Sequence, residues 1–280
     1  MNAVGIIAAL TIREALRRKL IAALAVICLA MIGLSAWGFY RLSHTSGLTS
    51  GEIGGAVPEA FILFMFMFSF VIALSASAVA SLSVSTEIDS GVLQAVVTRP
   101  VRRSEVLLGK WLGLVAILAA YTALVCGLQV GVVFWVSGFV PPNPAAAAAF
   151  LFAEGVALLT LVLLLSTRLS ALAAGVTGVA LFGMAWLAGV VGSFGQLLKI
   201  PALHTVSVVS EYLLPTDGLW HGAIYYLEPT SYLAFQSGNQ DRGDAFFAAG
   251  APAGTYLIWA VIWFALVLAL GMLSFGRREL

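Results

Sequence analysis

Long apolar runs without a charged side chain define the pattern of this chain. A helix needs about 20 consecutive apolar residues to cross a bilayer core that is about 30 Å thick. Most of the uncharged runs have room for one such helix, and the longest has room for two. In chain order the runs are Leu20–Tyr40, Ala60–Thr86, Trp111–Ala153, Leu169–Leu198 and Ala245–Gly276.

The longest run is interrupted by the sequence Pro141-Pro142-Asn143-Pro144. A helix cannot continue through these prolines, because each lacks the backbone N–H and clashes with the preceding turn. Asn143 followed by Pro144 is instead a typical N-cap and first-turn pair for a new helix. The pattern therefore predicts six transmembrane helices, near residues 20–40, 60–84, 111–138, 145–166, 170–193 and 254–275.

The composition supports a chain whose solvent is lipid. Apolar residues make up 61% of the chain and charged residues 10%, whereas about a quarter of a soluble domain is charged. The fold class is therefore all-α integral membrane. Cys28 and Cys126 both lie in apolar runs, which indicates small buried side chains and not a disulfide framework. The first run is too long for a signal h-region, so we expect a retained first helix.

The placement of Lys and Arg predicts the orientation, because cytoplasmic loops carry an excess of these residues. With the N-terminus inside, only Arg41, Lys199 and Arg242 of the fourteen Lys and Arg lie outside. Both termini are therefore predicted to be cytoplasmic. The remaining eleven then lie inside: Arg13, Arg17, Arg18, Lys19, Arg99, Arg102, Arg103, Lys110, Arg168, Arg277 and Arg278.

Three polar segments remain outside the spans of what we predict to be a single transmembrane domain over residues 1–280. Residues 1–19 place apolar side chains first and charges last, which favours an interfacial helix. Residues 83–110 form the main cytoplasmic segment, and residues 194–253 form the main external one. These two are the segments long enough to contact a partner outside the bilayer.

The cytoplasmic segment contains a short apolar helix at residues 92–97. Glu87 and Asp89 precede it, and Pro100 ends it. Because its apolar side needs burial and lies outside the bilayer, we expect this helix to dock on a soluble partner.

The polar residues after this short helix have two explanations. Positive-inside anchoring explains Arg102 and Arg103, taken singly, about as well as docking does. Ser104 with Glu105 is expected to cap the third span, because a serine N-cap and a first-turn acid satisfy free N–H groups and the helix dipole.

A set of residues in this segment resembles a known family. The set comprises Glu87, Gly91, Leu93, Pro100-Val101, Arg103 and Leu107-Leu108-Gly109-Lys110. It is similar to the segment after the second helix of ABC-2 type exporter permeases, which are of the type V exporter kind. Val92 stands where that family often has Thr. The sequence Leu214-Pro-Thr-Asp-Gly-Leu-Trp220 further resembles the branch linked to maturation of multicopper enzymes.

The resemblance implies an assembly in which this chain is the membrane part. Two such subunits, identical or closely related, would sit on two cytosolic ABC ATPase subunits that bind ATP and Mg. The short helix after span two would be the coupling helix, and short external helices would help to close the exit. The coupling residues would be Glu87, Asp89, Gly91, Leu93, Arg99, Pro100, Arg102, Arg103 and Glu105.

Small residues recur at four-residue intervals in two predicted spans. Such faces let membrane helices approach closely. They predict either packing within the subunit, which is the more common use, or a lining of the transport pathway. The residues are Ser69, Ala73, Ser77 and Ser81 in span two, and Gly109, Gly113, Gly127 and Gly131 in span three.

Outside these motifs, polar residues point to structure more than to chemistry. Glu154 is the one acid inside a predicted span, and we expect it at the outer interface, where it can reach water. Short helices are expected at residues 205–214 and 219–227, lying at the membrane interface. Their aromatic residues suit the headgroup level: Trp220, Tyr225, Tyr226 and Tyr232.

No enzyme site is expected in this chain. The histidines, His44, His204 and His221, are all external and lack metal-ligand spacing. Gly109-Lys110 is not a phosphate loop, because Ser104 and Trp111 stand where the motif needs Gly and Ser or Thr. We therefore expect no cofactor here and no nucleic-acid partner.

The sequence thus favours the permease subunit of an ATP-driven ABC-2 type exporter in a bacterial or archaeal plasma membrane. A periplasmic accessory protein is a further expected partner. The alternative is a secondary transporter or channel without an ATPase, which a midplane acid or a broken helix would support. The substrate cannot be deduced from the sequence, nor whether the subunit moves a substrate or transmits force.

Overall fold

The computed structural model describes residues 3–17, 19–44, 50–89, 102–229 and 250–277. These parts of the chain are helical with short connections and contain no strand. Six of the helices are long and apolar enough to cross a membrane, which confirms the predicted number of spans. The helices are α1 (Ala3–Arg17), α2 (Lys19–Ser43), α3 (Ser50–Asp89), α5 (Arg103–Ser137), α6 (Pro144–Ser166), α7 (Ala171–Leu197), α8 (Pro201–Leu213), α9 (Thr216–Leu227) and α11 (Gly254–Gly276).

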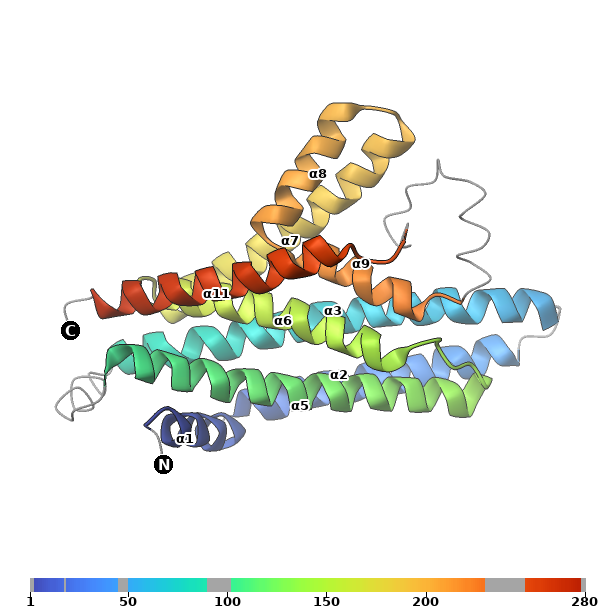
Figure 1. The fold of residues 1–280 in the computed structure, drawn as a ribbon. Coiled ribbons are helices and arrows are strands. Elements are labelled where there is room, and N and C mark those ends of the chain that lie inside the picture. Colours follow the sequence, from blue (N-terminus) through green and yellow to red (C-terminus); the bar gives the residue numbers. More distant parts are fainter. Residues whose placement is uncertain (1–2, 18, 45–49, 90–101, 230–249, 278–280) are drawn as a thin grey trace.

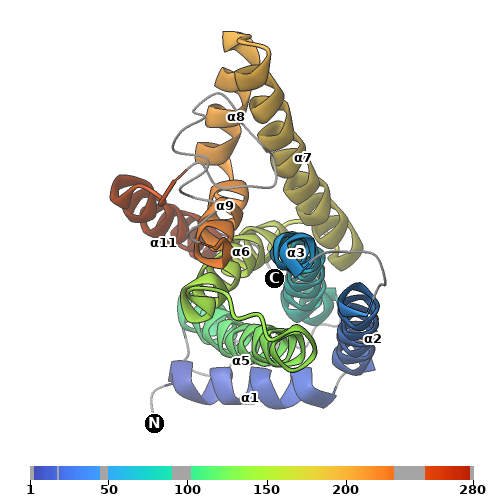
Figure 2. The same ribbon diagram turned by 90° about the vertical axis from the view of Figure 1, so that its right-hand side faces the viewer.

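The helices α3 and α6 form the centre of the bundle (Figures 1 and 2). Side chains from both are fully enclosed, such as Phe61 and Phe68 of α3 and Leu151 and Leu158 of α6. The outer faces of α2, α7 and α11 expose large apolar side chains instead, which suits contact with lipid. The α7–α8 hairpin leans away from the bundle, whereas α9 returns to it and packs along α6.

The connection between α5 and α6 follows the predicted cap. Asn143 Oδ1 accepts a hydrogen bond from the backbone N–H of Ala146 at 3.1 Å, and Pro144 occupies the first turn. At the other side of the connection α5 ends at Gly138, whose φ of 72° is in the left-handed region that glycine adopts without a steric cost.

Two helices begin earlier in the chain than the apolar runs predicted. The helix α3 starts at Ser50 and continues through Pro58, and α5 starts at Arg103. A helix can extend beyond its apolar stretch, because backbone hydrogen bonds also form between charged and polar residues. Hydropathy does not detect this part of the helix. Ser104, which we had expected to be the N-cap, therefore lies inside the helix. The cap is Arg102, whose backbone N–H donates to Glu105 Oε2 at 3.1 Å.

The N-terminal helix α1 packs across α5 and uses two of the predicted small residues (Figure 2). A Cβ on Gly109 would lie 2.8 Å from Ile7 Cβ, and one on Gly113 would lie 2.8 Å from the backbone oxygen of Ala8. Real Cβ atoms do not approach that closely, so these glycines allow α1 to reach α5.

The second glycine pair in α5 has a different setting. Gly127 and Gly131 are exposed and have nothing within 4 Å of an added Cβ among the described residues. The four glycines that the sequence placed in one class therefore divide into a packed pair and an open pair.

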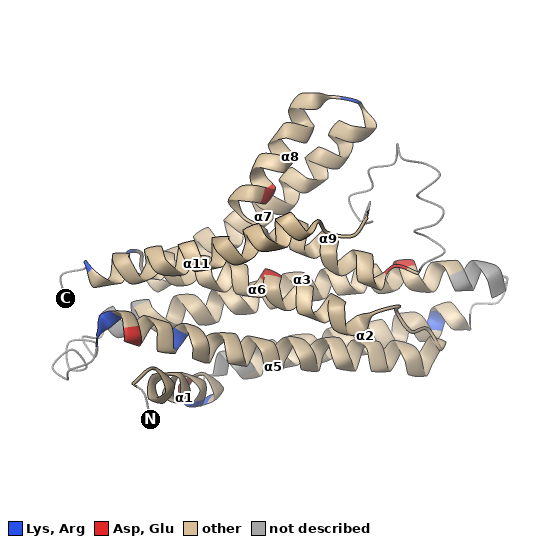
Figure 3. Cartoon of the chain, in the orientation of Figure 1, with Lys and Arg blue, Asp and Glu red and all other residues tan. Residues whose placement is uncertain are grey.

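Basic side chains gather at the end of the bundle that holds both termini (Figure 3). This end also contains the start of α5 and the α6–α7 turn with Arg168. The structure thus places together the described segments that carry inside Lys and Arg in our prediction, namely α1, the start of α5, the α6–α7 turn and the end of α11. Which side of the membrane this end faces stays a prediction.

The orientation can be tested by thiol labelling in a background with Cys28→Ala and Cys126→Ala. We expect Ser46→Cys and Ser237→Cys to react with an impermeant reagent in intact cells, and Ser104→Cys only after permeabilisation. Labelling of Ser104→Cys in intact cells would invert the topology.

The glycine contacts predict opposite effects for two similar substitutions. Gly113→Ala should lower the thermal unfolding midpoint in detergent, because the new Cβ displaces α1. Gly127→Ala should be neutral or stabilising by up to about 1 kcal/mol, since alanine is the better helix former and the site is open. Equal midpoints for both variants would show that α1 is not seated on α5.

Candidate functional site

The predicted coupling segment lies largely outside the described residues. Gly91, Leu93, Arg99 and Pro100 belong to this part, and so does the expected helix at 92–97. Glu87 and Asp89 are in the last turn of α3, and nothing is described of their side chains. The structure therefore describes the helices on both sides of the segment, and the segment's own contacts stay a prediction.

A buried lysine joins the two helices on either side of this segment. Lys110 of α5 is only 6% exposed, and its Nζ donates a hydrogen bond to the backbone oxygen of Ser83 in α3. Val84 and Leu107 are buried close by in the sequence on the same two helices. A displacement of the segment between them would therefore reach α3 and α5 together.

The arginines at this end contact the C-terminus of α11. Arg103 Nη1 donates to the backbone oxygen of Gly276 at 3.4 Å, and Arg168 Nε donates to Ser274 Oγ at 2.9 Å. Cations at a helix C-terminus are favoured by the partial negative charge of its free carbonyl groups. Arg102 is exposed and Arg103 is partly buried, so Arg102 is the more accessible of these two arginines of the predicted coupling set.

The small-residue face of α3 is buried within the subunit. Ser69, Ala73, Ser77 and Ser81 are each at most 3% exposed. Ser77 Oγ donates to the backbone oxygen of Gly175 in α7 at 3.0 Å, and a Cβ on that glycine would lie 3.2 Å from Ser81 Oγ. In the closed subunit this face is a helix-packing surface for α6 and α7.

Glu154 is buried near the middle of α6, and our expectation of an outer-interface position was wrong. The residue is 3% exposed, and Ser69 Oγ donates to its Oε1 at 2.7 Å. The reason is the packing of α9, a distant part of the chain, over this part of α6. Hydropathy along α6 contains no information about that cover.

The helix α9, which we had expected at the membrane interface, packs against α3, α6 and α7 of the bundle. Trp220 is 2% exposed, and its ring centroid lies 5.4 Å from that of Phe66 in α3. On the opposite helix α6, Phe150 occupies the space beside Gly222, where a Cβ would collide with its ring. Tyr225 and Tyr226 are only half-buried, and Tyr232 lies outside the described residues.

An acidic group surrounds the start of α9. His221 Nδ1 lies 3.6 Å from Asp217 Oδ2 and 2.9 Å from the backbone oxygen of Asp217. His221 therefore lies on α9, one turn after Asp217 and beside its carboxylate. Tyr256 of α11 donates to the backbone oxygen of Pro215 at 3.1 Å and closes the turn before α9.

Burial shifts the protonation of both acids in this group. It raises the pKa of Asp217 to about 6, an effect that His221 reduces and Glu211 adds to. Burial also raises the pKa of Glu211, again opposed by His221. A carboxyl group that titrates near pH 6 at a helix junction can respond to moderate changes of pH.

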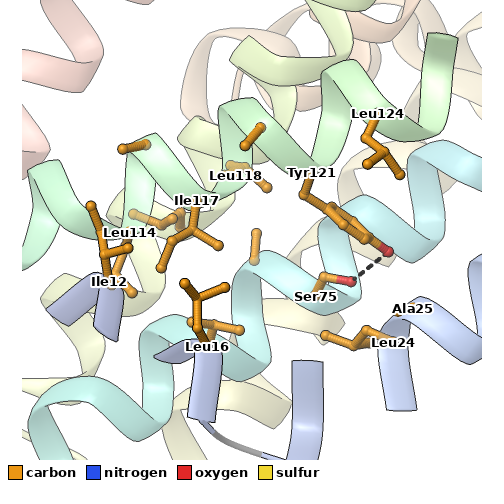
Figure 4. A pocket seen from close by; sticks show the side chains of 15 residues that line it. Ile12, Leu16, Leu24, Ala25, Ser75, Leu114, Ile117, Leu118, Tyr121 and Leu124 are labelled. Atoms are coloured by element: carbon orange, nitrogen blue, oxygen red, sulfur yellow. Dashed lines mark hydrogen bonds between the residues drawn. The ribbon is translucent and has the colours of Figure 1, made fainter. Parts of the chain in front are cut away.

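An apolar groove of about 400 Å³ lies between α1, α2, α3 and α5 (Figure 4). Its walls are aliphatic apart from the hydroxyl groups of Ser75 and Tyr121, which lie 3.4 Å apart. The groove offers no charged group. No cluster of three or more His, Cys, Asp or Glu that could hold a metal occurs in the part of the chain that the structure describes.

Comparison with protein families matches residues 7–280 to the model described as ABC-2 family transporter protein. The match covers nearly the whole chain and concerns the family as a whole, so the branch linked to multicopper enzymes stays a prediction. The search of curated proteins finds no match.

The shift at Asp217 predicts a pH-dependent stability. Between its ordinary pKa of 3.8 and about 6, Asp217 is protonated in the native state and ionised in the unfolded chain. The native state then binds more protons, so stability falls as pH rises across this window, by roughly 3 kcal/mol in all. The thermal unfolding midpoint in detergent should therefore increase when the pH is lowered through this window.

The variant Asp217→Asn should flatten this dependence, and Glu59→Gln, at an exposed position of α3, should leave it unchanged. An unaltered pH profile in Asp217→Asn would show that another group is responsible.

Proposed function

Because the chain belongs to the ABC-2 transporter family, we propose that it is the permease subunit of an ATP-driven exporter whose ATPase is a separate cytosolic chain. The family match over residues 7–280 carries this proposal. The six candidate spans give the chain the form of a multi-pass membrane protein. The sequence around Gly109-Lys110 lacks the phosphate loop, so ATP and Mg would bind to the partner.

The contacts at the basic end support a route for mechanical coupling. Lys110 ties α5 to α3, Arg103 ties α5 to α11, and Arg168 ties the α6–α7 turn to α11. An ATPase that moves the segment between α3 and α5 would therefore move α3, α5, α11 and the α6–α7 turn together. We place the coupling contact on the nine residues named above, with Leu93 on the apolar side of the short helix.

Two copies of this subunit, or one copy and a related permease, would form the membrane part of the transporter. The exposed apolar faces of the outer spans leave room for such a contact. The assembly would export a substrate or perform work on a periplasmic accessory protein.

One observation favours the alternative of a secondary transporter. Glu154 is a buried acid near the middle of a span, which is typical of proton-coupled pathways. No other described span contributes an acid to the cavity that Glu154 lines, where the second acid is Asp217 of α9. The family match further favours the ATPase-linked function.

The coupling proposal is tested by retention of the ATPase on purification. Leu93→Asp puts an unpaired charge in a contact that should be desolvated, at a cost of several kcal/mol. We expect the variant to insert normally, because the residue lies outside the bilayer, and to lose the co-expressed ATPase subunit.

The matched control is Leu48→Asp, the same change in the loop predicted on the opposite side of the membrane. It should keep the partner. If correctly inserted Leu93→Asp also keeps the partner, the short helix is a connector only, and if the wild-type chain transports without any ATPase, the alternative holds.

A further inference from the structure

A small polar cavity lies under α9, enclosed by α3, α6 and α7. Its volume of about 10 Å³ is room for one water molecule. Polar residues face it from three of the four helices: Ser69 of α3, Glu154 of α6, and Thr216, Asp217 and Trp220 of α9. Aromatic rings form the remaining wall, from Phe66, Phe70, Phe182 and Trp186.

Three polar atoms on this cavity have no hydrogen-bond partner among the residues that the structure describes. They are Glu154 Oε2, Thr216 Oγ1 and Trp220 Nε1, on residues that are 3%, 1% and 2% exposed. Thr216 and Trp220 are four residues apart and therefore share one face of α9. Buried polar groups without partners are rare in native proteins, so three around one cavity point to a bound species.

The chemistry of the three atoms identifies that species as water and not a metal ion. Trp220 Nε1–H can only donate a hydrogen bond, which a cation cannot accept. A water accepts from Trp220 and Thr216 and donates to Glu154 Oε2 and to the carboxylate of Asp217. One molecule thus satisfies every unpartnered atom, as buried waters with several polar partners do.

Among the described residues around the cavity, the one basic side chain beside its two carboxyl groups is His221, whose Nδ1 lies 3.6 Å from Asp217 Oδ2. The described part of α3 and α7 contributes no titratable group to its walls. The titratable neighbours are Glu211 and Tyr212 of α8, His221 of α9 and Tyr256 of α11. His221 is the one that can become positive, and it lies on the outer side, 30% exposed.

Two adjacent carboxylates in a desolvated site repel each other, so at least one of them holds a proton. We propose that Glu154 and Asp217 form a buried proton-binding site, which shares one proton and one bridging water and thereby holds α9 against the transmembrane bundle. Loss of that proton would leave two buried negative charges between α6 and α9 and would displace α9. Proton binding at this site does not depend on whether the chain assembles with an ATPase.

The outer surface offers a path for the proton. A second cavity of about 230 Å³ is lined by Glu211, His221 and Tyr256, among others. Asp217 lines the smaller cavity together with Glu154, and its Oδ2 lies 3.6 Å from Nδ1 of His221, which lines the larger one. External acidity therefore reaches the pair through α9 itself.

The proposal is tested on the full chain in lipid nanodiscs by thiol accessibility. Ala223 is fully enclosed in α9, so Ala223→Cys in the background without Cys28 and Cys126 reports whether α9 is seated. Thr205→Cys on the exposed face of α8 reports the pH dependence of a freely accessible thiol. We expect Ala223→Cys, relative to Thr205→Cys, to be labelled by a permeant maleimide at least tenfold faster at high pH than at neutral pH.

Amide variants separate proton binding from simple instability. Glu154→Gln or Asp217→Asn leaves at most one negative charge on the pair, so either one should abolish the acceleration at high pH. Infrared spectra should show a protonated carboxyl group in the wild type at neutral pH. That signal should be lost in the double variant and kept in Glu59→Gln.

Three results would overturn the proposal. The first is the same relative labelling of Ala223→Cys at both pH values, and the second is the absence of the protonated carboxyl signal. The third is protection of Ala223→Cys by Na⁺ over K⁺ at constant ionic strength, which would identify a metal-ion site in place of a proton site.

Discussion

The hydrogen bond from Ser69 to Glu154 lies at the centre of the bundle, and the packing around it decides where the outer part of the chain can sit. In lipid, a carboxyl group must find its partners inside the protein, because no water is at hand to provide them. Ser69 satisfies one oxygen of Glu154, and the other faces the cavity that α9 closes. The position of α9 therefore depends on the hydrogen-bonding requirement of Glu154 in α6, in addition to the apolar contacts of Trp220 and its neighbours.

The helix α3 connects this acid to the opposite end of the bundle. Along one face it contacts Glu154 through Ser69 and α7 through Ser77, and near its end the backbone oxygen of Ser83 accepts from Lys110. Small side chains on this face allow the close approach that membrane helices need, because they associate without a hydrophobic driving force between them. A rigid helix with polar contacts at its middle and near its C-terminal end is suited to transmit a displacement from the basic end to the part of the bundle that α9 covers.

The sequence was sufficient for features that depend on local pattern. Five apolar runs, a Pro-rich break in the longest of them and Asn143 as a cap predicted the six spans and the α5–α6 connection, because each depends on neighbouring residues alone. It was insufficient where distant segments meet. Three features depend on which helices pack against each other, which hydropathy does not report. They are the burial of Glu154, the contact of His221 with Asp217, and the close approach of α1 to Gly109 and Gly113.

The Leu214–Trp220 sequence shows how one short segment can combine these roles. Pro215 ends the link from α8 and accepts the hydrogen bond of Tyr256, so the start of α9 is fixed to α11. Thr216, Asp217 and Trp220 then present polar atoms to the cavity, and Gly218 leaves space for Glu211 and the Tyr256 ring, where a Cβ would collide. Because the fixed point and the polar atoms are so close in sequence, the attachment of α9 to α11 and the polar side of the cavity both depend on the first turn of α9.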